Sequence, residues 1–258
     1  MGIALKRPDE VFFNKIYILQ SLDSTELWTA EDIGRLIHYI GLREKNVLVE
    51  LLNINSSAGF INKLDHISKE IKVGGLPYIH FEMHGAPEGL SLTNGEIIPW
   101  QDLKEPLRDL NILTKNNLFI SLATCYGSHL LSIYQPFEPC PFYGYLAPLK
   151  EAGVRDLHAS FVTFFETLLV KNDFDLAITE IISNDSSIDW VFLNCRAYFD
   201  QLKVMYAEDY NNPRVLRQRV NEVVRSYRLK NPNSGSTRKA NKGSRKPIQK
   251  WGCGANLR

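Results

Sequence analysis

A histidine and a cysteine stand at the ends of two apolar runs that have the composition of buried strands. The first run, residues 76–85, ends in His84-Gly85, and the second, residues 117–127, contains Cys125. A thiolate is a strong nucleophile, and an imidazole beside it can accept the thiol proton and later protonate a leaving amine. These residue types in this order point to acyl transfer through a cysteine nucleophile.

Glycine follows the histidine directly, and a second glycine follows the cysteine closely. Without a Cβ, Gly85 lets a substrate backbone approach, and its amide is free to donate to an oxyanion. We expect the amide of Cys125 to be the second donor, and Gly127 to keep the turn after the cysteine uncrowded. The alternative is that each residue is ordinary, since a cysteine at the end of an apolar strand is most often a small core residue. Only the combination of order, histidine, cysteine and glycines favours catalysis.

The elements that must position these residues alternate along the chain between apolar runs and stretches of helical periodicity. An Asn94-Gly95 pair between two short apolar segments predicts a β-hairpin after the histidine. Such alternation predicts an α/β fold with a mostly parallel central sheet and helices on both faces. Ligands of these sheets bind beyond the carboxyl ends of the strands, where His84 and Cys125 lie. We expect strands over residues 15–19, 46–52, 76–85, 117–125 and 142–146, and helices over residues 30–37 (capped by Thr29), 62–71, 100–113, 156–170, 173–182, 188–206 and 214–229.

The same residues resemble the caspase-like (clan CD) cysteine peptidases. In that family a strand ending in His-Gly is followed by a hairpin, a helix and a strand ending in the nucleophilic cysteine. Here these parts are matched by His84-Gly85, by residues 89–92 and by residues 122–127. The resemblance covers residues 15–170 and is greatest to the bacterial CHAT branch, which is related to separase.

The resemblance implies a caspase-hemoglobinase-like fold and hydrolysis of peptide bonds through a thioester, with His84 as general acid/base and Cys125 as nucleophile. It implies no metal and no organic cofactor. Caspases proper carry Gln-Ala before the cysteine where this chain has Ala123-Thr124, so cleavage after aspartate is not implied. Small CHAT-like peptidases in bacteria belong to antiviral defence or regulated-death systems. We therefore expect a protein substrate, and control by a regulatory protein or ligand.

Two acidic residues are further candidates for the site. Asp156 resembles an acidic position after the fifth strand of separase-like members, where it favours a basic residue before the scissile bond; the alternative is a helix cap. Glu82 alternates with His80 and His84 on one strand face. We expect Glu82 to bind substrate or, with His80, to support the site, unless the face is simply polar. This spacing is not the helical His-Glu-x-x-His of zinc peptidases, so we expect no metal.

The composition is that of an ordinary soluble globular protein. The chain has 258 residues, of which 44% are hydrophobic and 23% charged. It contains no apolar run of the roughly 18 residues that span a bilayer, and we expect no membrane association. Its four cysteines are widely spaced, which suggests neither a zinc ribbon nor a dense disulfide framework. We therefore expect a reducing, cytoplasmic setting.

The net charge of +1 hides an asymmetry. Residues 223–258 contain ten Lys and Arg and no Asp or Glu, while the rest carries 20 basic and 29 acidic residues, a net charge of −9. We expect a peptidase domain over residues 1–229 and a basic, disordered tail over residues 230–258. Three roles are open for this tail. It increases solubility, it binds nucleic acid or an acidic partner, or it is a segment that the protein cuts from itself. An alternative function is a catalytically inactive interaction module that binds a protein or nucleic acid through this tail.

Overall fold

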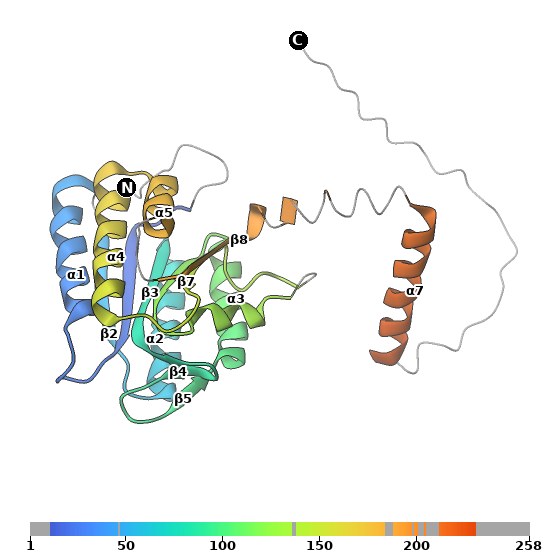
Figure 1. The fold of residues 1–258 in the computed structure, drawn as a ribbon, viewed down its shortest axis with the longest axis horizontal. Helices are drawn as coiled ribbons and strands as arrows, with labels where there is room; N and C mark the ends of the chain where they lie inside the picture. Colours follow the sequence, from blue (N-terminus) through green and yellow to red (C-terminus); the bar gives the residue numbers. More distant parts are fainter. Residues whose placement is uncertain are drawn as a thin grey trace, which may run out of the picture. The chain divides into compact units, whose positions relative to one another are not determined.

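The computed structural model describes residues 11–45, 47–135, 138–183, 188–197, 199–200, 204 and 212–230. The chain divides into two compact units, residues 1–201 and residues 202–258. The first unit holds a central sheet (Figure 1), and most of the described part of the second is helix α7, Pro213–Lys230. This helix was expected, whereas residues 231–258 of the predicted tail lie outside the described residues. The predicted boundary at residue 229 and the binding roles of the tail stay predictions.

An eight-stranded sheet forms the centre of the first unit, and its main path runs in the order β2-β1-β3-β6-β7-β8. The first five strands of this path are parallel, and β8 runs antiparallel to β7. Two short strands, β4 and β5, form the predicted hairpin beyond β3. The strands are β1 (Lys15–Ser21), β2 (Leu48–Asn53), β3 (Pro77–Ala86), β4 (Gly89–Ser91), β5 (Ile97–Pro99), β6 (Phe119–Ala123), β7 (Gly144–Pro148) and β8 (Trp190–Asn194).

Helices cover both faces of this sheet (Figure 1). One face carries α1 (Thr29–Ile40), α4 (Val154–Glu166) and α5 (Phe174–Ser183), and the other carries α2 (Ser57–Lys72), α3 (Lys104–Leu113) and a 3₁₀ segment (Gly127–Ile133). Side chains alternate along the strands. Tyr78 of β3 therefore packs on the face covered by α1, α4 and α5, and Ile79 packs on the face covered by α2 and α3. The predicted α/β class, with a mostly parallel sheet between helices, is confirmed. In the described part of the chain, no helix has both the length and the apolar character required to cross a membrane.

The last strand corrects part of one expectation. The sequence predicts a helix over residues 188–206, whereas the structure has β8 over residues 190–194 and helix at residues 195–197 and 199–200. Val191 and Leu193 pack on the α2 side of the sheet, and Trp190 and Phe192 pack on the α1 side. A strand that is covered on both faces has a continuous apolar run, which periodicity alone does not distinguish from a buried helix.

Candidate functional site

The carboxyl ends of β3 and β6 meet at one edge of the sheet. The two strands pair in parallel as far as Glu82 and Ala123, and His84 and Cys125 lie two residues farther along each chain. Gly85 then packs directly on the cysteine, because a Cβ at this position would collide with the carbonyl oxygen of Cys125. The structure thus brings the main chains of the predicted pair together, and the close approach requires glycine.

The imidazole of His84 is held by a carboxylate from another loop. Its Nε2 lies 2.5 Å from Oε1 of Glu26, in the segment between β1 and α1. The other carboxylate oxygen, Oε2, accepts a hydrogen bond of 2.5 Å from the amide of Asp23. The side chain of His84 is 63% exposed, so the imidazole is open to solvent. Sequence analysis missed Glu26; its only signal was its place in the loop after β1, whose carboxyl end lies at the same edge.

The thiol of Cys125 is partly buried and donates to the carbonyl oxygen of Ala152 at 3.7 Å. Gly127, two residues on, is required by packing: a Cβ there would lie 2.8 Å from the side chain of Ala147. Among the contacts of the described residues, no hydrogen bond joins the thiol to His84. The two candidate groups, the imidazole of His84 and the thiol of Cys125, thus lie at one edge of the sheet, each with a different partner.

A chain of buried polar groups runs below this edge, on the α1 side of β3. The Tyr78 hydroxyl donates to Oγ of Ser121 at 2.9 Å, and that Oγ lies 2.8 Å from Nδ1 of His80. The other ring nitrogen, Nε2, is 3.2 Å from Oε1 of Glu82, whose Oε2 accepts from the Thr29 hydroxyl at 3.0 Å. All five residues are at most 4% exposed. Burial raises the pKa of Tyr78, so its hydroxyl stays protonated and can donate. Burial of these polar groups is tolerated because each of them has a hydrogen-bond partner.

These contacts bear on the roles expected for Glu82, which stay predictions. Because Glu82 is buried and both of its carboxylate oxygens are engaged, the geometry favours support of the site over contact with a substrate.

The same contacts also correct the expectation for Thr29. The residue before α1 is Trp28, which makes no capping hydrogen bond through its side chain, and Thr29 is the first residue of the helix. Its hydroxyl ties α1 to β3, three residues after Glu26.

Asp156 is exposed and lies in the first turn of α4. The residue that precedes the helix is Gly153, so the alternative in which Asp156 caps α4 is wrong. An acidic side chain in a first turn is still favourable, because it faces the positive end of the helix dipole. Asp156 lies four residues after Ala152, which contacts the Cys125 thiol. Its role in substrate selection stays a prediction.

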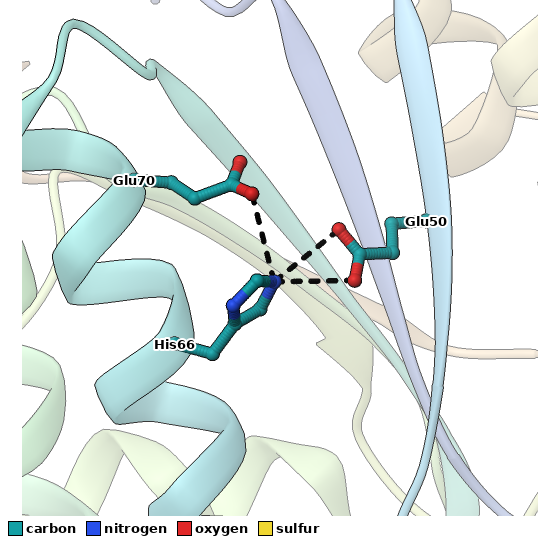
Figure 2. A group of neighbouring side chains, drawn as sticks. All are labelled: Glu50, His66 and Glu70. Atoms are coloured by element: carbon teal, nitrogen blue, oxygen red, sulfur yellow. Dashed lines mark hydrogen bonds and ion pairs between the residues drawn. The ribbon is translucent and has the colours of Figure 1, made fainter.

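The described residues contain a second group of titratable side chains, Glu50, His66 and Glu70, whose nearest ligand atoms lie within 4.8 Å of one another (Figure 2). Nε2 of His66 is 3.1 Å from Glu50 and 3.6 Å from Glu70. The ammonium of Lys15, at the amino end of β1, lies 2.6 Å from Glu50 and 2.8 Å from Glu70. Because this ammonium already takes the position of a cation between the carboxylates, we interpret the group as an ion-pair cluster.

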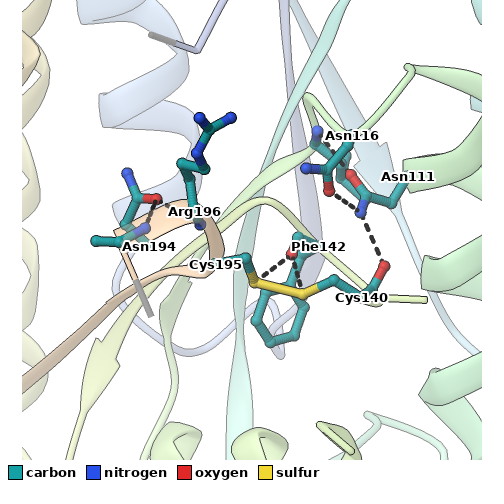
Figure 3. The surroundings of a disulfide bond; sticks show 9 residues. Asn111, Asn116, Cys140, Phe142, Asn194, Cys195 and Arg196 are labelled. Atoms are coloured by element: carbon teal, nitrogen blue, oxygen red, sulfur yellow. Dashed lines mark hydrogen bonds between the residues drawn. A yellow bond between two sulfur atoms is a disulfide. The ribbon is translucent and has the colours of Figure 1, made fainter. Parts of the chain in front are cut away.

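Two of the other cysteines form a disulfide, Cys140–Cys195, across 55 residues (Figure 3). Both sulfur atoms lie 2.8 Å from the carbonyl oxygen of Phe142, and Asn111 donates to the carbonyl of Cys140 at 2.8 Å. Within the described residues this leaves Cys125 as the free thiol. One bond is no dense framework, but disulfides persist mainly in oxidising compartments, so it opposes the expected reducing setting, which stays a prediction.

Comparison with protein-family models finds no match, and comparison with curated proteins finds none either. Among solved structures, the chain is similar to one described as the complex of Porphyromonas gingivalis RgpB pro- and mature domains, with a TM-score of 0.43 and 11% sequence identity. The similarity covers 67% of this chain and 43% of that chain, so this chain spans less than half of the other's length.

Proposed function

We propose that the protein is a cysteine endopeptidase of the caspase-like clan, of the CHAT branch, and that it cleaves a partner protein through Cys125 and His84. The packing of Gly85 against the carbonyl of Cys125 carries this proposal. It brings a strand end that bears an imidazole next to a strand end that bears the free thiol, at the edge where ligands of parallel sheets bind.

In the proposed reaction His84 takes the proton of the Cys125 thiol, and the thiolate attacks the carbonyl carbon of the scissile peptide bond. The amides of Gly85 and Cys125 donate to the oxyanion of the tetrahedral intermediate. His84 then protonates the leaving amine as the carbon–nitrogen bond breaks, which leaves a thioester on Cys125. Water, deprotonated by the same imidazole, hydrolyses the thioester and regenerates the thiol.

Glu26 has the position of the group that orients the base. Because Nε2 contacts this carboxylate, Nδ1 is the ring nitrogen of His84 that would accept the thiol proton, and the negative charge of Glu26 favours the imidazolium that forms during the attack. For this geometry the thiol must exchange its hydrogen bond to Ala152 for one to the imidazole. Such bonds are often long in the absence of substrate and tighten when it binds.

The biological setting and specificity belong to the same proposal. Resemblance to the CHAT branch supports a role in bacterial defence or regulated death, with activation by a regulatory protein or ligand. Cleavage after a basic residue is supported by the acidic side chain of Asp156, four residues beyond Ala152.

The test is alkylation by a peptide that carries an acyloxymethyl ketone, followed by mass spectrometry of the modified site. We expect stoichiometric labelling of Cys125 that Cys125→Ala abolishes and that His84→Ala slows by about 100-fold. His129→Ala is the matched control, because His129 is an exposed histidine that contacts the carbonyl of Pro87. Peptide cleavage that persists in Cys125→Ala, or equal labelling rates in the His84 and His129 variants, would refute the assignment.

One observation favours the second candidate, an inactive interaction module. The imidazole and the thiol have other partners, Glu26 and Ala152, in the structure. A module of this kind would bind its partner through the basic face of α7, where Arg214, Arg217 and Arg225 surround a shallow hollow. If the protein is such a module, Cys125 would not react with the peptide ketone, whatever the sequence of the peptide.

A further inference from the structure

Strand β2 is the edge strand of the sheet, and one of its sides is open. The sheet path begins with β2, and among the described strands it pairs with β1 alone. Such an edge offers unpaired amides and carbonyls to another strand, and proteins commonly protect it with lysine, proline, a bulge or a covering segment. β2 contains neither lysine nor proline, and its pairing with β1 runs through all six of its residues without a bulge. The described residues therefore leave this edge ready to pair.

The backbone groups that point to the open side belong to alternate residues of β2. The amides of Leu48 and Ile54, at the start of the strand and just after its end, donate to carbonyl oxygens on the β1 side. The direction of these groups alternates along a strand. The amides and carbonyls that point away from β1 are therefore those of Val49, Leu51 and Asn53.

The α1 face beside this edge is apolar and hollowed. The side chains of Val49 and Leu51 form, with the outer side of α1, a groove of about 470 Å³. Trp28, which lines the groove directly before α1, is 62% exposed, and Tyr39, near the end of the helix, is 61% exposed. Large exposed apolar side chains beside an open edge are typical of a surface that binds another polypeptide.

We propose that β2 pairs with β2 of a second copy of this chain, antiparallel about a two-fold axis at Leu51, so that the two sheets become one. In this register Leu51 lies opposite Leu51 of the second copy, and Val49 lies opposite Asn53 of the second copy. All of these residues direct their backbone groups outward, so each amide and carbonyl at the edge obtains a partner. The interface is isologous, because both copies contribute the same surface.

Charge selects this register over its neighbour. A two-fold axis at Glu50 would also align outward backbone groups, but it would place the two Glu50 side chains directly opposite each other, and like charges in that position are unfavourable. With the axis at Leu51, Glu50 lies opposite the apolar Leu52 of the second copy. Glu50 also keeps its ion pair with Lys15, which lies on the other side of β2.

The helix beside the edge is complementary to itself in the same orientation. A two-fold axis perpendicular to the sheet leaves both α1 helices on one face and makes them antiparallel. The first turn of α1 carries Glu31, and its last turn carries His38. The acidic start of each helix therefore approaches the basic end of the other, and Trp28 approaches Tyr39 of the second copy. A partner of uniform charge would be repelled at one end, so this surface fits a second copy best.

The first test is the mass of the protein in solution. It uses the full chain carrying Cys125→Ser, so that the result does not depend on the proposed peptidase function. By sedimentation over about a hundredfold range of concentration we expect an equilibrium of monomer and dimer. Val49→Pro removes an outward amide and keeps the hydrogen bonds to β1, and we expect it to raise the dissociation constant by about tenfold or more. Ile112→Lys, an exposed position in α3, is the control and should leave the constant unchanged.

The second test reads the register directly. When Cys253→Ser is added, the remaining cysteines are Cys140 and Cys195, which are joined to each other. Leu51→Cys then places two thiols across the axis, with Cα atoms about 5.5 Å apart, within the range of a disulfide. Leu48→Cys is the matched control on the same strand, because the two copies of residue 48 would lie about 20 Å apart. With copper phenanthroline and oxygen we expect a covalent dimer of Leu51→Cys and none of Leu48→Cys, although residue 48 is 63% exposed.

A chain that is monomeric at every concentration, or a dimer that Val49→Pro does not weaken, would overturn the proposal. So would a dimer in which Leu51→Cys crosslinks no better than Leu48→Cys, because that result indicates collision or another surface. If Val49→Pro does not fold, crosslinking at residue 51 decides alone. A monomer that dimerises only after removal of residues 1–10 would instead assign the edge to that segment of the same chain.

Discussion

Glu26 and His84 are 58 residues apart in the sequence, and their side chains meet at 2.5 Å at the carboxyl edge of the sheet. Glu26 reaches this position because Thr29, three residues later, is anchored on the buried Glu82 of β3. The loop that carries the carboxylate and the strand that carries the imidazole are therefore joined twice, once at the surface and once in the core.

Removal of the charge on Glu26 should slow the chemistry without unfolding the protein. In Glu26→Gln we expect the rate of Cys125 alkylation by the peptide ketone to fall by about 10- to 100-fold, because the imidazolium loses its partner. The free energy of unfolding should change by no more than about 0.5 kcal/mol, since the pair is exposed. Glu105→Gln, which removes an exposed carboxylate that pairs with Arg108, is the control. Equal alkylation rates in the two variants would remove Glu26 from the site.

A methyl group at Gly85 should separate the two strand ends. Gly85→Ala places a Cβ against the carbonyl oxygen of Cys125, and we expect a loss of about 1–3 kcal/mol in the free energy of unfolding together with slower alkylation. The control is Gly34→Ala in α1, whose new Cβ would lie an ordinary 3.6 Å from Ile18. That change should be neutral or stabilise by up to about 1 kcal/mol. If urea unfolding gave the same stability for both variants, the close packing at Gly85 would be wrong.

The buried end of the polar chain can be tested with an isosteric substitution. Thr29→Val keeps the shape of the side chain but removes the donor to Oε2 of Glu82, and we expect a loss of about 1–3 kcal/mol. Thr163→Val removes a hydroxyl whose hydrogen-bond partner among the described residues is a carbonyl of its own helix, and should cost no more than about 0.5 kcal/mol. Urea titration of the two variants measures the difference, and a difference of zero contradicts the buried contact.

Acid should weaken the ion-pair cluster on β1, β2 and α2. Hydrogen bonds from Lys15 and Tyr17 lower the pKa of Glu70 in the folded chain, so the unfolded chain, with a Glu pKa of about 4.3, takes up the proton first. The contribution of ionised Glu70 to the free energy of unfolding is fully present above the unfolded-state pKa. It is lost as the pH falls through the lower folded-state pKa. It is modest, because Glu70 is 34% exposed. When the pH is lowered from about 6, the denaturation midpoint of Glu70→Gln should fall less steeply than that of the parent protein. The same pH dependence in both proteins would contradict a contribution from Glu70.

The sequence predicts those parts of the site that lie at the ends of strands. His84 and Cys125 follow apolar runs, and the alternation of strands and helices is enough to place both at one edge. The requirement for Gly85 is also visible in the sequence, although its structural cause is contact with the cysteine backbone, which only the strand order reveals.

What the sequence does not predict depends on how elements pack. Glu26 belongs to a loop, and its carboxylate becomes a neighbour of His84 only when α1 packs beside β1 and β3. Thr29 has the residue type of a cap, and the buried carboxylate of Glu82 overrides that preference. β8 has the apolar content of a buried helix, and only its pairing with β7 makes it a strand.

The disulfide between Cys140 and Cys195 has a consequence for the fate of a cut chain. A single proteolytic nick anywhere between these two residues leaves two polypeptides that remain covalently linked through sulfur. On a non-reducing gel the nicked protein would migrate as one species, and it would separate into two fragments once a thiol is added. A single maturation cleavage within this interval would therefore leave β6, β7 and β8 in one covalent assembly until the disulfide is reduced.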